Sequence, residues 1–250
     1  WKKRSFDPYK IQYEAAVRSL DSGKEALVDF MGLNHTRLNV VKKATGTPAL
    51  LHWAGVYGGG YDIQTGNYVP KGKERPPAVP ESKVQTTIGY RCEWGHNIDT
   101  SLDRSLFDLQ TDLEVSAMSH PAFNPGTKTR CDFQRGFDPD LSRRFLFRTP
   151  IFMRKTDKSQ SIEDARISQT MPVHTWLSTA VAESRQSSYY VNPKKPKVFE
   201  FVDNRLQDIA GCHPPYLQPG DIVWFSFTIS LRVGSNNWWP EFGLEEIIRV

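Results

Sequence analysis

The strongest constraint on the fold lies near the C-terminus, where apolar residues occupy every second position over eleven residues. These positions are Val223, Phe225, Phe227, Ile229, Leu231 and Val233. Successive side chains point to opposite sides only in an extended strand, so this spacing excludes a helical face. The intervening positions are mostly small and polar, but they include Trp224 and Arg232. We therefore expect a long strand with one face in the core and the other face exposed.

The same segment continues through a polar turn at 234–237 into a second strand. This pattern predicts a C-terminal β-hairpin over about 220–250. The second strand opens with Trp238 and Trp239, and adjacent strand residues point to opposite sides. We therefore expect one of these two rings in the core and the other one exposed.

The C-terminal segment reads PGDIVWFSFTI, a polar turn, and then WWPEFGLEEIIRV. It resembles the last two strands of OB-fold single-stranded-DNA-binding proteins, over about thirty of the 250 residues. The resemblance implies an OB-like barrel and a single-stranded nucleic-acid ligand.

The rest of the chain predicts a single α+β domain over 1–250 that is dominated by β-structure. We expect an antiparallel barrel or a strongly curved sheet, OB-like, with peripheral helices and long loops. A helical segment is predicted over about 6–32, and a Gly- and Pro-rich stretch predicts a mobile loop over about 57–83. Further strands are predicted at 38–41, 49–56, 86–94, 107–115, 145–153 and 198–202, and further helices at 161–169 and 175–185.

Composition narrows the class of protein. The net charge of +4 permits a phosphate-bearing partner without requiring one. Three widely spaced cysteines do not form a disulfide framework, which favours an intracellular protein of the nucleus or cytoplasm. Their spacing relative to the histidines does not favour a zinc site either, so we predict no metal. No apolar run is long enough to cross a bilayer, and the oligomeric state is left open.

Short basic runs with aromatic residues nearby favour a basic groove that binds nucleic acid, either single-stranded DNA or RNA. In such grooves cations follow the backbone and aromatic rings stack under the bases. No cofactor or catalysis is needed for this function. The candidate contact residues are Lys71, Lys73, Arg75, Arg143, Arg144, Arg148, Trp224 and Arg232.

Two groups of acidic residues suggest an alternative, a nuclease or another nucleic-acid enzyme that uses Mg²⁺. Asp108, Asp112 and Glu114 would share one face of the predicted strand at 107–115, where grouped carboxylates can hold a divalent cation. The second group, Asp62 with Glu81 and Lys83, has the outline of a nuclease site. A further alternative is a protein-interaction or assembly module, because exposed Trp residues and Pro-rich loops can contact another chain.

Overall fold

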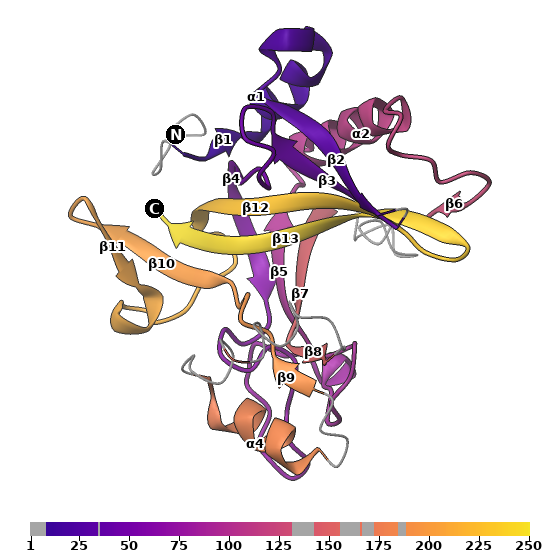
Figure 1. The fold of residues 1–250 in the computed structure, drawn as a ribbon. Helices are drawn as coiled ribbons and strands as arrows, with labels where there is room; N and C mark the ends of the chain where they lie inside the picture. Colours follow the sequence, from indigo (N-terminus) through magenta and orange to yellow (C-terminus); the bar gives the residue numbers. More distant parts are fainter. Residues whose placement is uncertain (1–8, 35, 132–142, 156–165, 167–172, 185–188) are drawn as a thin grey trace.

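The protein has a β-dominated α+β fold built on one large mixed sheet with few helices (Figure 1). The computed structural model describes residues 9–34, 36–131, 143–155, 166, 173–184 and 189–250. Within these ranges, no helix has the length and apolar character needed to cross a membrane.

Thirteen strands and three α-helices make up the regular structure of the described residues. The helices are α1 (Tyr13–Ser19), α2 (Ser105–Met118) and α4 (Thr175–Glu183). The first eight strands are β1 (Ile11–Gln12), β2 (Val28–Asn34), β3 (Arg37–Lys42), β4 (Leu51–Gly60), β5 (Glu93–Asp99), β6 (Thr129–Arg130), β7 (Arg144–Pro150) and β8 (Phe152–Arg154). The last five are β9 (Tyr189–Val191), β10 (Lys197–Val202), β11 (Arg205–Asp208), β12 (Ile222–Val233) and β13 (Asn237–Arg249). Short 3-10 turns lie at Leu20–Glu25, Glu81–Lys83 and Ile209–Gly211.

Strand β12 is the centre of the sheet, whose main order is β11-β10-β13-β12-β4-β5-β7. It pairs antiparallel with β13 along its whole length. On its other edge, its first half pairs with β4 and its second half pairs with β3. The predicted C-terminal hairpin is therefore correct, and it connects all parts of the large sheet.

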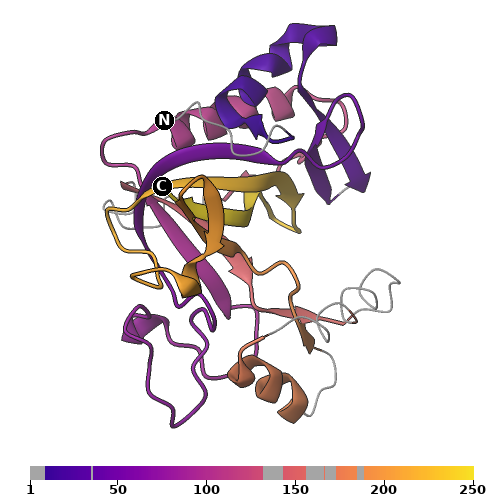
Figure 2. The same ribbon diagram turned by 90° about the vertical axis from the view of Figure 1, so that its left-hand side faces the viewer.

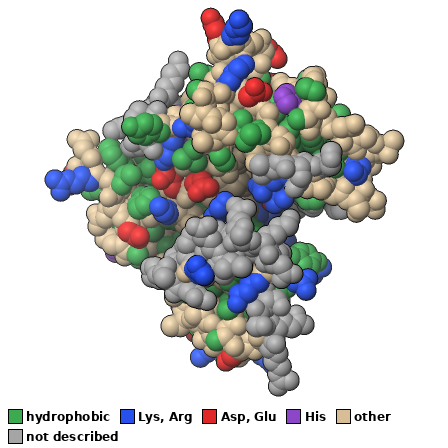
Figure 3. Space-filling view, viewed as in Figure 1, with side chains coloured by type: hydrophobic (Ala, Val, Ile, Leu, Met, Phe, Trp, Pro, Cys, Tyr) green, Lys and Arg blue, Asp and Glu red, His purple; other side chains and the backbone are tan. Residues whose placement is uncertain are grey.

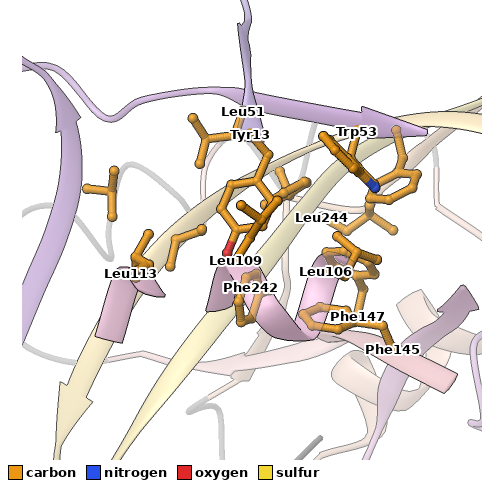
Figure 4. Packing of buried hydrophobic residues seen from close by; sticks show 14 of the residues in the cluster. Tyr13, Leu51, Trp53, Leu106, Leu109, Leu113, Phe145, Phe147, Phe242 and Leu244 are labelled. Atoms are coloured by element: carbon orange, nitrogen blue, oxygen red, sulfur yellow. The ribbon is translucent and has the colours of Figure 1, made fainter. Parts of the chain in front are cut away.

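The predicted inward face of β12 is confirmed, since its six alternate apolar residues are all buried. Phe225 and Phe227 contact aromatic rings of β7 and β13. Figure 4 shows Phe145, Phe147 and Phe242 from these two strands in the core. Ring centroids lie 5.3 Å apart for Phe147 and Phe225, and 4.9 Å apart for Phe145 and Phe242. Tyr13 of α1 and the leucines of α2 close this core from the other side. Such aromatic pairs favour edge-to-face geometry, which fixes how the strands pack.

The helices lie at two ends of the sheet. Figures 1 and 2 show α1 and α2 together at one end, and α4 with β8 and β9 at the opposite end. A second apolar cluster packs beneath α4 and includes Trp94, Phe152 and Leu177.

The sheet curls so that β7 and β13 approach each other, but no closed barrel is found among the described residues. The rings of Phe145 and Phe242 meet across the core, yet no ladder joins the two strands that carry them within the described ranges. The sheet is also mixed rather than antiparallel, because β10 and β6 run parallel to β13 and β1 runs parallel to β4.

The predicted acidic strand at 107–115 is wrong, because these residues form helix α2. Phe107, Leu109 and Leu113 fit a period of two, but the buried residues Leu106, Leu109, Leu113 and Ala117 recur at helical spacing. Upstream, Asp103 accepts hydrogen bonds from the backbone nitrogen and hydroxyl of Ser105, which favours a helix start there.

The N-terminal prediction is correct only in part. The predicted helical segment at 6–32 contains α1 and a 3-10 turn, but its last residues form strand β2. Gly23 has a φ of +57°, a left-handed conformation that ends the helical stretch. Residues 6–8 of the segment lie outside the described ranges.

Other boundaries were predicted with mixed success. Helix α4 and strand β10 are confirmed, but the strand predicted at 86–94 starts only at Glu93. Of the helix predicted at 161–169, only Arg166 is described. The predicted loop over 57–83 begins inside β4, and its middle is anchored by buried Tyr68 and Val79, so its mobility stays a prediction.

Candidate nucleic-acid interface

Strands β5 and β7 present one exposed face to the outside of the curled sheet. In β7, Phe145 and Phe147 point into the core, whereas Arg144, Leu146 and Arg148 point outward. The ladder places these three residues opposite Asp99, Asn97 and Gly95 of β5. We call this exposed surface of β5 and β7 the outer face.

A large hollow of about 890 Å³ lies at one end of the outer face. Its floor includes the backbone of 58–60, and its walls include Tyr61, Tyr216 and Arg144. The glycines are needed for close packing, because a Cβ at Gly60 would lie 2.6 Å from the carbonyl oxygen of Gly95. These glycines, for which the sequence suggested only a loop, therefore shape a surface depression.

A smaller hollow of about 220 Å³ lies at the other end, where β7 approaches β13. Its lining includes Arg148, Leu146, Tyr90 and Trp239. Tyr90 is highly exposed, and the guanidinium carbon of Arg91 lies 5.6 Å from the centre of its ring. Because Arg144 borders the large hollow and Arg148 borders the small one, the outer face connects the two.

Acidic residues lie beside these arginines. Nε of Arg148 is 3.8 Å from Oε1 of Glu93, whose pKa is raised by burial. Hydrogen bonds from Ser101, followed by the charges of Arg144 and Arg143, hold the pKa of Asp99 below its usual range. The side chain of Arg148 is about half exposed and its contact with Glu93 is long, so a phosphate can compete for this guanidinium.

Arg232 lies further along the same surface, where β12 meets β3. Its partner across the β12–β13 ladder is Trp239, and its partner across the β12–β3 ladder is Arg37. Both arginines contact Glu241, which also lines the small hollow. Figure 3 shows Lys and Arg side chains at several separate places on this face, some of them near the middle of the molecule beside Asp or Glu side chains. Sequence reasoning missed Arg37, although its position beside Leu38 and Val40 fits the outward side of an alternating strand.

Trp224 is not available for stacking, which corrects its predicted role. Its side chain is 1% exposed. It packs against Ala54 and Ile248, and its ring centroid lies 5.1 Å from that of His52. Strand β10 adds beside β13 and brings further apolar side chains onto this part of the sheet. By contrast, the prediction for the adjacent pair is confirmed, since Trp238 is buried and Trp239 is partly exposed.

The other predicted basic residues are exposed but are placed differently. Lys71, Lys73 and Arg75 belong to a turn that continues into the prolines bordering the large hollow, yet none of the three lines it. Arg75 is engaged with the carbonyl oxygen of Val79. Arg143 immediately precedes β7 and is exposed.

The first group of acidic candidates has a structural role rather than a metal-binding geometry. Glu114 is buried, and its Oε1 accepts hydrogen bonds of 2.8 Å from both Gln110 and Arg130. Asp108 and Asp112 lie one turn apart on the exposed side of α2.

The second group is divided between two turns. Asp62 accepts hydrogen bonds from the backbone nitrogens of Gln64 and Thr65, which stabilises its own turn. Glu81 and Lys83 lie on an exposed 3-10 turn. Across the described ranges, no three His, Cys, Asp or Glu side chains are grouped so that they could hold a metal ion.

Comparison with known proteins gives one set of similar structures. No family model matches the chain, and no curated protein matches it. Among solved structures, the chain is similar to the single-stranded DNA-binding protein from bacteriophage Enc34 with a C-terminal truncation. The TM-score is 0.37 at 7% identity, over 89% of this chain and 94% of that chain. The same phage protein in complex with ssDNA gives a TM-score of 0.36 at 8% identity, with the same coverage. At this level of similarity, function has to be inferred from the residues of this chain.

Proposed function

We propose that the protein binds single-stranded nucleic acid on the outer face, as a binding protein without catalysis. The observation that carries this proposal is the outward alternation of β7, which presents Arg144 and Arg148 between two aromatic-lined hollows. Two cations on one strand, with Tyr61 in the lining of one hollow and Trp239 in the lining of the other, suit a flexible polyanion whose bases are free to stack.

Each part of this surface has a defined role in the proposal. Arg144, Arg148 and Arg232 neutralise backbone phosphates, which releases counterions and makes affinity fall with salt. Tyr61, Tyr90 and Trp239 offer ring faces to the bases, each stacked base contributing about 1–3 kcal/mol. Because every base has a stacking face and phosphates carry no sequence information, the surface predicts weak sequence preference.

The strand connectivity supports an OB-like reading of this site. Strands β4, β5 and β7 form an antiparallel meander, and β12 and β13 return beside β4. These pairings make β7 and β13 run in the same direction on the two sides of the open seam. An OB-fold is a partly open five-stranded barrel that binds oligonucleotides over its second and third strands. If the five strands are counted along the chain as β4, β5, β7, β12 and β13, the second and third strands are β5 and β7, which carry the outer face.

The proposal is tested by titrating fluorescein-labelled oligo(dT) and oligo(U) with the protein at several salt concentrations. We expect binding at low salt that weakens linearly with the logarithm of salt concentration, and weaker binding to a duplex of the same length. If the protein binds neither oligonucleotide at low salt, or binds without salt dependence, the proposal is contradicted. Comparing the affinities for oligo(dT) and oligo(U) also decides between DNA and RNA.

A further inference from the structure

Two arginines, one on β3 and one on β12, lie side by side beyond the outer face, next to the small hollow. Arg37 and Arg232 are directly opposed in the antiparallel ladder between β3 and β12. Like charges at opposed positions destabilise a sheet. Consistent with this, burial and then the charge of Arg232 lower the pKa of Arg37. The side chains are 35% and 37% exposed, so both are accessible to a ligand.

Glu241 lies between the two guanidinium groups and accepts from both. Its Oε2 is 2.9 Å from Nε of Arg232 and 3.5 Å from Nη2 of Arg37. The same oxygen is 3.2 Å from the hydroxyl of Ser230. Three hydrogen-bond donors surround this one carboxylate oxygen, so the position is suited to bind an anionic oxygen. We call this binding position, formed by Arg37, Arg232 and Ser230, the seat.

The carboxylate of Glu241 does not compensate all the positive charge and hydrogen-bond donors of the seat. One negative charge faces two positive ones, which leaves a net charge of about +1 at the site. In addition, Nε of Arg37 is buried and has no hydrogen-bond partner among the residues that the structure describes. A buried donor without a partner costs about 1–3 kcal/mol. A phosphate has more oxygens than Glu241 offers here, and it can satisfy a guanidinium in the bidentate geometry that uses Nε.

We propose that Glu241 occupies the seat of a backbone phosphate between Arg37 and Arg232, and that bound nucleic acid displaces it. This inference rests on the proposed function and extends its surface beyond the outer face. Glu241 borders the small hollow together with Trp239 and Arg148, so a strand lying along the outer face reaches the seat directly. The carboxylate then acts as an internal competitor. It lowers affinity for any polyanion and keeps the arginines paired when no strand is bound.

Substitution of Glu241 tests this inference, with a substitution of Glu14 as the matched control. Glu241→Gln removes one negative charge but keeps the shape of the side chain. Glu14→Gln removes one negative charge from the Glu14–Arg18 pair of helix α1, away from the seat. We expect Glu241→Gln to tighten oligo(dT) binding at least fivefold at fixed salt, and Glu14→Gln to change it by less than twofold. An equal gain in both variants, or none for Glu241→Gln, would overturn the inference.

A double-mutant cycle separates occupation of the seat from simple repulsion of the ligand. If Glu241 blocks the seat, then Arg37→Ala weakens binding and removes most of the gain that Glu241→Gln gives in the parent protein. A gain that persists undiminished with Arg37→Ala would mean that Glu241 only repels phosphate, and the inference would be wrong. Urea unfolding of each variant confirms that the folded protein is being compared.

The two proposals fail in distinguishable ways. If the parent protein does not bind oligo(dT) at low salt, both are wrong. If binding occurs and Arg148→Ala weakens it, while Glu241→Gln behaves like Glu14→Gln, only the phosphate seat is wrong.

Discussion

The ring of Tyr61 lies directly over Gly95. A Cβ built at position 95 would stand only 2.7 Å from Cε2 of Tyr61, and Gly95 faces Arg148 across the β5–β7 ladder. The absence of a side chain at Gly95 therefore leaves room for the Tyr61 ring on the outer face, and the residue paired with Gly95 is the half-exposed Arg148.

The first prediction concerns this ring. Tyr61→Ala should weaken oligo(dT) binding by about 1–3 kcal/mol, because one base loses its stacking partner. Gly95→Ala should weaken binding in the same direction by pushing the ring off the face. Fluorescence titration measures both effects, with Tyr61→Phe as the control that keeps the ring. If Tyr61→Ala binds as tightly as Tyr61→Phe, the ring has no part in the interface.

The arginines of β7 give the second prediction. Arg144→Ala and Arg148→Ala should each weaken binding, and each should reduce the slope of log K against log salt by about 0.7, the value for one phosphate contact on a single strand. Titrations at four or more salt concentrations measure the slope. Arg18→Ala is the matched control, because Arg18 is 75% exposed on helix α1. Equal slopes for all three variants would exclude β7 from the contact surface.

A third prediction follows from the burial of Trp224. Trp224→Ala should lower the free energy of unfolding by about 3–5 kcal/mol, since it removes a fully buried aromatic side chain. Urea unfolding followed by circular dichroism measures this change. The folded fraction of the milder variant Trp224→Phe should bind oligo(dT) like the parent protein. Weaker binding by a stably folded Trp224→Phe would restore the stacking role that the sequence suggested.

The fourth prediction is a pH dependence of stability. Burial lowers the pKa of His96 from 6.5 to about 4, and its Nδ1 lies 3.1 Å from the hydroxyl oxygen of Tyr57. The unfolded chain takes up this proton near pH 6.5, whereas the folded protein does so only near pH 4. Stability is therefore complete above pH 6.5 and falls as the pH decreases towards 4. By pH 5 the loss from this group is about 2 kcal/mol.

Comparing His96→Gln with the parent protein isolates this contribution. Glutamine can also form a hydrogen bond with Tyr57 but does not titrate. The buried His52, whose pKa is also lowered to about 4, is common to both proteins. Urea unfolding at pH 7 and pH 5 should show a smaller loss for the variant, by about 2 kcal/mol. An identical loss in both proteins would mean that His96 is not protonated on unfolding.

The sequence was most informative where a single periodicity was possible. Six alternate apolar residues in β12 fit only a strand, so the C-terminal hairpin and its inward face were predictable. The residues of α2 satisfied both periods at several positions, and local pattern alone could not choose between them. There the structure depended on packing of the helix against Tyr13 and the sheet, which a local pattern does not contain.

The candidate site divides in the same way. Arg144 and Arg148 were predictable because their outward direction follows from alternation within one strand. Trp224 was misjudged because the cover over it comes from β10, which is distant in sequence. Arg37 was missed because its pairing with Arg232 depends on which strand lies beside the second half of β12.

The position of β12 in the sheet also bears on how the protein is made. Strands β3 and β4 are synthesised early and can pair with β2 and β5, yet each has another edge that pairs with β12, which is distant in sequence. Contacts between residues so far apart in sequence slow folding. During translation these early strands therefore wait with open edges until residues 222–249 have left the ribosome, and this interval is when the nascent chain is most exposed to aggregation.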